Sequence, residues 1–233
     1  MRKSEKQKWH EMNREQRKQY FMDYYLFPLS VITVIVAVVC FLGWHFFLKP
    51  DEKNILYATV VDDSLDEKKQ AQAVSEIGDI LGADGKYKQV HIDDSFYLKD
   101  GALDKIQVYL HSQQIDVLIL DEDVFREFAG YGYFRSLDEL SEENLADKYY
   151  TEYVYAAGYR DSDEVSFEDH ETGQGEIKPY GLSLDGNNRY TDMSGGYLEH
   201  PVLAVAVNAP NPENALKFLD YLMDGKEGEN NGV

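Results

Sequence analysis

The sequence predicts an open, mostly parallel α/β sheet with helices on both faces, preceded by one N-terminal transmembrane helix. Three observations lead to this prediction. Residues 26–48 contain no Asp, Glu, Lys or Arg; short apolar runs alternate with amphipathic stretches from Ile55 onward; and residues 115–120, IDVLIL, are almost continuous in Ile, Val and Leu. Such a run is typical of a central parallel strand covered on both faces.

The apolar stretch LFPLSVITVIVAVVCFLGWHFFL, residues 26–48, is long enough to cross a membrane. At about 1.5 Å per residue a helix of this length spans the roughly 30 Å of bilayer hydrocarbon. Seven basic residues precede it within residues 1–25, and only Lys49 and Lys53 follow closely. The positive-inside rule therefore places this basic tail in the cytoplasm and the rest of the chain outside.

A cleaved signal peptide is the main alternative for this stretch. Its apolar core would be about 7 to 15 residues long and would be followed by a small-x-small cleavage site. The stretch is longer than that, and FLGWHFFLKP offers no such site. We therefore expect an uncleaved signal anchor, giving a single-pass protein of the cell membrane.

The outer part of the chain is strongly acidic. From Lys49 onward there are 16 basic and 39 acidic residues, a net charge of −23, whereas residues 1–25 carry seven basic and four acidic residues, a net charge of +3; the sum is the −20 of the whole chain. Nucleic-acid binding and close adhesion to anionic lipid both require a basic face, so we expect neither. The single cysteine, Cys40, leaves the outer domain without a disulfide.

After a linker at 49–53, strands and helices are expected to alternate through a domain at 54–223, and a disordered tail at 224–233 ends the chain. Asp66 and Glu67 lie in the first turn of a helix that Gly82 follows, and Asp121 can cap a later one. Strand and helix in this alternation form right-handed βαβ units. The expected strands are 55–61, 87–92 and 115–120, and the expected helices are 65–81, 102–112 and 122–129.

Three segments carry a more specific resemblance. Residues 115–140, IDVLILDEDVFREFAGYGYFRSLDEL, contain an Asp-Val dipeptide at the start of a strand and a Gly-Tyr-Phe-Arg-Ser-Leu-Asp turn after a helix. They resemble the first lobe of type 2 extracellular solute-binding proteins, the clamshell receptors of ABC importers. PYGLSLDGNN at 179–188 resembles that family's strand leading to the second lobe. HPVLAVAVNAPNPENALKFLDYLM at 200–223 resembles its returning strand and helix.

The chain departs from this family in two respects. In the family a second lobe of well over a hundred residues lies between the crossing and returning strands, whereas here only Arg189 to Glu199 joins them. A clamshell closes two lobes over its ligand, so one lobe offers half of a site. The predicted membrane helix also replaces the family's lipid anchor.

Candidate binding residues follow from topology. Ligands of open α/β sheets bind beyond the carboxyl ends of the strands, and here those ends are rich in carboxylates that suit sugar hydroxyls, a cation or Ca²⁺. Capping of the next helix, or plain solvation, is the alternative role for each of them. Two tyrosines after the third helix offer rings for stacking. The candidates are Asp62, Asp63, Asp94, Asp121, Glu122, Tyr131, Tyr133, Asp185 and Asn187.

We expect no metal, no cofactor and no enzymatic activity. Asp169, His170 and Glu171 lie in an acidic, turn-rich insertion at 158–178 that is typical of an exposed loop rather than a metal site. The chain has no G-x-S-x-G, P-loop, H-E-x-x-H or strand-linked G-x-G-x-x-G motif.

The sequence is consistent with two candidate functions. An accessory or interaction role, in which the face formerly covered by the second lobe holds a protein partner through an apolar patch, is favoured. The alternative is a module that binds a small solute such as a carbohydrate at the carboxyl ends of the strands. The family resemblance places either function in an ABC-transport context.

Overall fold

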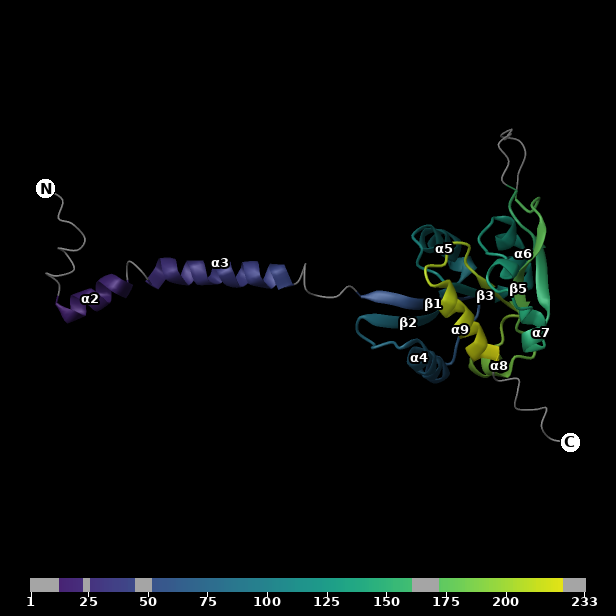
Figure 1. The fold of residues 1–233 in the computed structure, drawn as a ribbon, viewed down its shortest axis with the longest axis horizontal. Coiled ribbons are helices and arrows are strands. Elements are labelled where there is room, and N and C mark those ends of the chain that lie inside the picture. Colours follow the sequence, from purple (N-terminus) through teal and green to yellow (C-terminus); the bar gives the residue numbers. More distant parts are fainter. Residues whose placement is uncertain (1–12, 23–25, 45–51, 161–171, 224–233) are drawn as a thin grey trace. The chain divides into compact units, whose positions relative to one another are not determined.

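The computed structural model describes residues 13–22, 26–44, 52–160 and 172–223. The chain divides into two compact units, residues 1–51 and 52–233 (Figure 1). The expected tail at 224–233, the residues Asp169, His170 and Glu171 of the acidic insertion, and most of the expected linker lie outside the described residues.

The described residues of the first unit form helices α2 (Arg14–Phe21) and α3 (Phe27–Gly43). Asn13 caps α2 and forms a capping box with Gln16, which satisfies backbone N–H groups of the first turn. In α3 the hydroxyl of Thr33 donates to the carbonyl of Leu29 at 2.9 Å. Among the described residues, no helix combines the length and the apolarity that crossing a membrane requires.

The second unit, which we call the lobe, is built on one six-stranded sheet of order β2-β1-β3-β6-β5-β4. β1 pairs in parallel with β2 and β3, as predicted for the βαβ series. The remaining three pairs, β3 with β6, β6 with β5 and β5 with β4, are antiparallel. The strands are β1 (Lys53–Val61), β2 (Lys88–Phe96), β3 (Val117–Asp121), β4 (Tyr153–Ala157), β5 (Ile177–Ser183) and β6 (Pro201–Val205).

The predicted α/β class is therefore confirmed, but the parallel arrangement holds only for the first three strands and the sheet as a whole is mixed. The physical reason lies in the connections. Two sequential parallel strands need a crossover that carries the chain back to the end of the sheet where the first strand began. The connection from β5 to β6 stays at the end where β5 stops, so β6 runs in the opposite direction.

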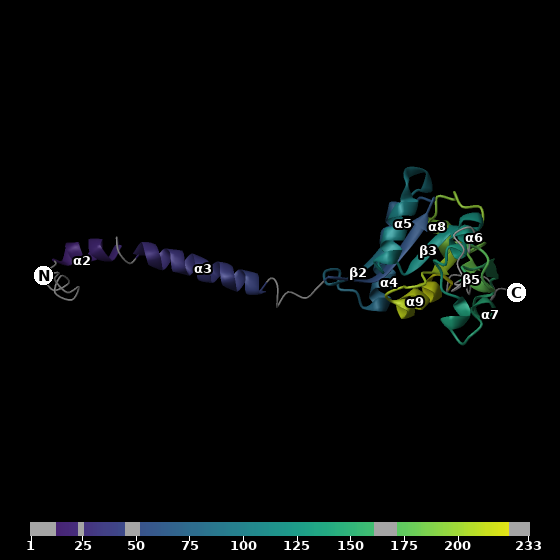
Figure 2. The same ribbon diagram turned by 90° about the horizontal axis from the view of Figure 1, so that it is seen from above.

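Helices cover both faces of the sheet, as predicted. Figures 1 and 2 show α4 and α9 on one face and α5 and α6 on the other. The described part of the lobe also has two short helices, α7 and α8, and two 3₁₀ turns. The helices are α4 (Glu67–Leu81), α5 (Ala102–His111), α6 (Glu122–Gly130), α7 (Leu145–Tyr149), α8 (Asn188–Met193) and α9 (Pro212–Met223), and the 3₁₀ turns are Leu98–Asp100 and Leu137–Glu139.

Local sequence explains the ends of α4. The Asp66 side chain accepts hydrogen bonds from the backbone N–H groups of Lys68 and Lys69, at 3.1 and 3.0 Å. Gly82 follows the helix with a φ of 70°, a left-handed conformation that glycine adopts without strain. Asp121 precedes α6 at the capping position, but its side chain makes no capping hydrogen bond, contrary to the prediction.

The Asp-Val dipeptide at the start of β3 has a structural role. Asp116 is fully buried and accepts hydrogen bonds from the backbone N–H groups of Tyr57 and Asn211, at 2.9 and 2.7 Å. It thereby joins β3 to β1 and to the segment before α9. Burial raises the pKa of the Asp116 carboxyl, although the two backbone donors oppose that shift.

Candidate functional site: the carboxyl edge of the sheet

The strand order brings the carboxyl ends of β1, β2, β3 and β5 to one edge, because β5 runs in the same direction as these three after two antiparallel steps. We call this the carboxyl edge. It carries six of the residues that the sequence assigns to a binding site, and these fall into two groups. Asp62, Asp63 and Asp94 lie at the β1 and β2 end, and Asp121, Glu122 and Asp185 at the β3 and β5 end.

Residues Arg189 to Glu199, which we call the connector, are fastened to this edge by Asp63. The Asp63 side chain is fully buried. Its Oδ2 accepts hydrogen bonds from the hydroxyls of Tyr190, at 2.7 Å, and Ser194, at 2.6 Å. Its Oδ1 accepts from the backbone N–H groups of Ser64, at 2.8 Å, and Tyr197, at 3.4 Å. Both carboxylate oxygens are thus used within the protein.

A second carboxylate holds the far end of the connector. Asp121 Oδ1 accepts from the backbone N–H groups of Glu199 and His200, at 2.9 and 3.0 Å. This explains why Asp121 does not cap α6. Between Ser194 and Tyr197, which both bond to Asp63, the N–H of Gly195 donates to the carbonyl of Ser64 at 2.6 Å. The connector therefore runs along the carboxyl edge from β1 to β3.

Three further candidates also bond to the protein itself. Asp62 Oδ1 accepts from the N–H of Leu98, and Asp94 Oδ2 accepts from the N–H of Leu65, each at 2.8 Å. Asn187 is fully buried. Its Oδ1 caps α8 by accepting from the N–H of Tyr190, and its Nδ2 donates to the carbonyl of Leu222 in α9 at 3.0 Å. These contacts tie loops together rather than expose polar atoms to a ligand.

Glu122 and Asp185 border a hollow of about 500 Å³, which we call the edge hollow. Arg126 crosses it, donating through Nε to Glu122 Oε1 at 3.0 Å and through Nη1 to the carbonyl of Tyr155 at 2.8 Å. His200 Nδ1 lies 3.3 Å from Asp185 Oδ2. The other lining residues are Glu152, Tyr153, Val154, Ile177, Ser183 and Val202.

The hydrogen bond to Asp185 raises the pKa of His200 above its ordinary value. Because the protonated imidazole is the form that pairs, the pair is complete below the ordinary histidine pKa of about 6.5 and is lost as pH rises through the raised value. We expect the NMR titration of His200 to move to lower pH in Asp185→Asn. An unchanged midpoint would contradict the pairing, and His111, at the end of α5, serves as the internal control.

The tyrosines at the end of α6 do not join this site. The rings of Tyr131 and Tyr133 lie 5.5 Å apart, and both pack against Phe128. The carbonyl of Tyr133 accepts from the N–H of Val207, which follows β6 at the opposite edge of the sheet. The hydroxyl of Tyr133 accepts from Gln107 at 2.9 Å. These rings are mainly packing residues, and they are remote from the carboxyl edge.

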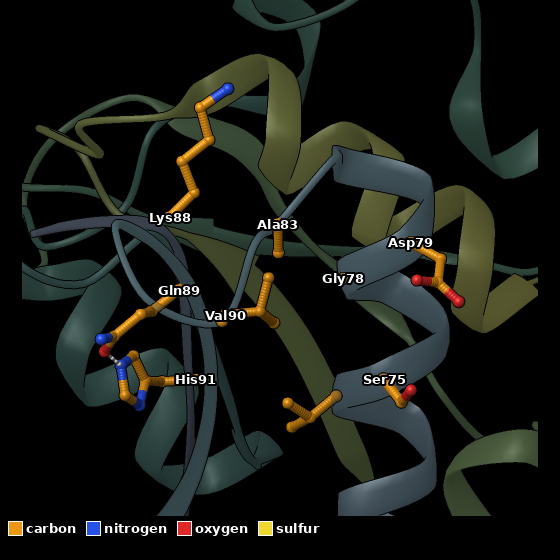
Figure 3. Close-up of a pocket in the computed structure, with 10 residues that line it drawn as sticks. Ser75, Gly78, Asp79, Ala83, Lys88, Gln89, Val90 and His91 are labelled. Atoms are coloured by element: carbon orange, nitrogen blue, oxygen red, sulfur yellow. Dashed lines mark hydrogen bonds between the residues drawn. The ribbon is translucent and has the colours of Figure 1, made fainter.

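A second hollow, of about 440 Å³, lies between α4 and the edge strand β2, where no candidate residue is found. Figure 3 shows the Val90 side chain pointing into the space beside Gly78 and Ala83, while Gln89 and His91 bond to one another at 3.2 Å. Small side chains on α4 leave this space open. It lacks the converging polar groups typical of a small-molecule site.

Sequence reasoning missed Arg126, His200 and two tyrosines of the carboxyl edge, Tyr97 and Tyr197. Arg126 follows Glu122 by four residues on one helix face, which is a signal for an ion pair. Within the described ranges, no group of three or more His, Cys, Asp or Glu side chains is placed to hold a metal ion.

Comparison of this chain with models of protein families, with curated proteins and with solved structures finds no match.

Proposed function

We propose that this chain is a membrane-anchored, extracellular domain of the solute-binding-protein type that serves as a non-catalytic accessory or interaction protein, in an ABC-transport or cell-surface context. The observation that carries the proposal is the position of the connector. It covers the carboxyl edge, where a solute would bind, and Asp63 and Asp121 accept its donors.

This arrangement argues against a solute held by the strand-end carboxylates. A ligand would have to displace hydrogen bonds that are already made, one of them to a fully buried carboxylate. Leaving such a group without its partners is strongly unfavourable. The 11 residues of the connector, Arg189 to Glu199, therefore cover the carboxyl edge, which a ligand and a second lobe would cover in a two-lobed receptor.

The order of the strands also supports the proposed kinship. β5 ends at the carboxyl edge and β6 returns from it, beside β5 and antiparallel to it. These are the segments whose sequences resemble the crossing and returning strands of the type 2 receptors. The membrane anchor in the proposal rests on the uncharged residues 26–48 and on the charge difference across them.

The edge hollow favours a second candidate function, the capture of a small solute. Its Arg126–Glu122 and His200–Asp185 pairs each place a donor beside an acceptor. Paired groups of this kind suit adjacent hydroxyls of an uncharged solute, and the volume of about 500 Å³ is in the range of small-molecule sites. A carbohydrate is the class that fits best.

One experiment with the full chain tests both candidates. Membranes that contain the protein are washed with alkaline carbonate, and the retained chain is heated with maltose, cellobiose, chitobiose, glycine peptides or Ca²⁺ while its melting temperature is followed. A ligand that binds only the folded state raises this temperature as its concentration passes the dissociation constant. We expect retention in the washed membrane and no saturable shift with any solute.

Two results would overturn the proposal. Release of the chain by carbonate would contradict the anchor. A saturable shift that is abolished in Arg126→Ala but kept in Arg135→Ala would establish solute capture at the edge hollow, because Arg135 does not line it.

A further inference from the structure

Two tyrosines stand exposed at the carboxyl edge. Tyr97 follows β2 and Tyr197 lies in the connector, with 37% and 71% of their surfaces exposed. The segments that carry them are attached to consecutive residues of one loop, because Leu98 N–H bonds to Asp62 and Tyr197 N–H bonds to Asp63. Residues 100 positions apart in the sequence thus share one surface.

The Tyr197 ring lies close to the connector backbone at Gly195. A Cβ atom at Gly195 would lie 2.8 Å from Cε2 of Tyr197 and 2.7 Å from the hydroxyl of Ser64. Glycine is therefore needed here so that the ring can lie close to the backbone. The hydrogen bonds of Asp63 and Ser64 hold that backbone in place. The backbone that carries Tyr197 is thus held before any partner arrives, which lowers the entropy lost on binding.

The surroundings of the two rings are acidic. The three loop segments 62–66, 93–98 and 192–199 contain seven carboxylates and no Lys or Arg. Asp192 is paired with Lys69 at 2.5 Å. Asp62 and Asp94 each use one oxygen for a backbone N–H, and within the described parts of the chain their second oxygens have no hydrogen-bond partner. Partial burial, with the nearby Asp94 carboxylate, raises the pKa of Tyr97, so its ring stays uncharged.

Elsewhere in the lobe, positively charged side chains of the protein itself make cation–π contacts with aromatic rings. Lys105 Nζ lies 3.7 Å from the centre of the Phe96 ring, and the Arg189 guanidinium lies 4.2 Å from that of Tyr221. Among the described residues, no cation lies over Tyr97 or Tyr197. Both rings can therefore be reached by a cation from outside the molecule.

We propose that Tyr97 and Tyr197, flanked by the carboxylates of Asp62 and Asp94, form a docking surface for an arginine- or lysine-rich segment of a protein partner. We call this surface the tyrosine platform. Cations bind tyrosine faces and carboxylates together, and tyrosine is enriched among the residues that dominate protein interfaces. The net charge of −23 from Lys49 onward steers a basic partner toward the lobe. This inference rests on the proposed interaction role and names the chemistry of the partner.

The test uses the full chain in nanodiscs of phosphatidylcholine, whose uncharged surface does not attract basic peptides. A fluorescent peptide of alternating arginine and glycine is titrated and its polarisation measured, with a glutamate–glycine peptide as the comparison. We expect saturable binding of the basic peptide alone, weakened as NaCl rises from about 50 mM to about 500 mM.

Substitutions then locate the surface. The double variant Tyr97→Ala, Tyr197→Ala is expected to bind about tenfold more weakly, whereas Tyr97→Phe, Tyr197→Phe stays within about twofold because phenylalanine keeps the cation-binding ring. Tyr150→Ala is the matched control, since Tyr150 is 88% exposed and lies at the end of α7. Circular dichroism checks that each variant is folded.

Three results would overturn the platform: no saturable binding of the basic peptide, equal binding of the acidic peptide, or an effect of Tyr150→Ala as large as that of the double alanine variant. Each leaves the broader interaction role open to a partner elsewhere on the lobe. The interaction role is overturned by a different result, the saturable solute shift that Arg126→Ala abolishes, so the two failures are distinguishable.

Discussion

Replacing Asp63 with alanine is expected to lower the free energy of unfolding of the lobe by about 3 kcal/mol. The substitution leaves the buried hydroxyl of Tyr190 and the hydroxyl of Ser194 without their acceptor, and it releases the N–H of Tyr197. Because these groups belong to the connector, the carboxyl edge opens as well. Hydrogen exchange at the Tyr197 amide should therefore become faster in the folded protein.

Urea denaturation of residues 52–233, which form a compact unit with their own core, measures this change. The control is Asp123→Ala, because Asp123 is an exposed carboxylate in the first turn of α6, and it is expected to change stability by less than about 0.5 kcal/mol. Equal effects of the two substitutions would show that the Asp63 carboxylate does not hold the connector.

Replacing Phe125 with alanine is expected to destabilise the lobe by about 3 to 5 kcal/mol, the usual effect of removing a large buried aromatic side chain. Phe125 is fully buried and stacks on Phe134, with ring centres 5.3 Å apart and planes inclined by 9°. It also lies against Gly181, where a Cβ atom would stand 2.8 Å from Phe125 Cε2. We expect a cavity to remain where the ring was, since the surrounding core relaxes only in part.

The same denaturation assay tests this expectation. Phe125→Leu should fall between the wild type and the alanine variant, because leucine keeps part of the buried volume. Val108→Ala, on α5, is the control, since Val108 is 63% exposed and loses little buried surface. If Phe125→Ala were no more destabilising than Val108→Ala, α6 would not be held to the sheet by this contact.

Much of the first half of the lobe was predictable because its signals are local. The alternation of apolar runs and amphipathic stretches predicts β1, α4, β2, α5, β3 and α6 to within a few residues, and Gly82 alone indicates where α4 ends. That Asp66 caps α4 instead of lying in its first turn was decided by the structure. The antiparallel arrangement of β4, β5 and β6 was harder to predict from the sequence. Their direction depends on how the chain returns to the sheet, and β4 carries too short an alternating pattern to show that it forms an edge.

For the candidate site, the location of the carboxylates was predictable from the sequence but their binding partners were not. That Asp62, Asp63, Asp94, Asp121 and Asp185 share one edge follows from the order of strands and could be predicted. What each carboxylate binds could not. A carboxylate after a strand has the same sequence signature whether it binds a ligand, caps a helix or holds a remote loop.

The sequence by itself determined the α/β class, the uncharged N-terminal stretch, the acidic character of the lobe and the carboxylates at the strand ends, because periodicity and charge are properties of neighbouring residues. Only the tertiary structure decided that Asp63 bonds to Tyr190, 127 residues away, and that Tyr97 and Tyr197 stand together. Such contacts depend on which strands become neighbours and on where the connector lies. Long-range packing of the whole lobe sets both.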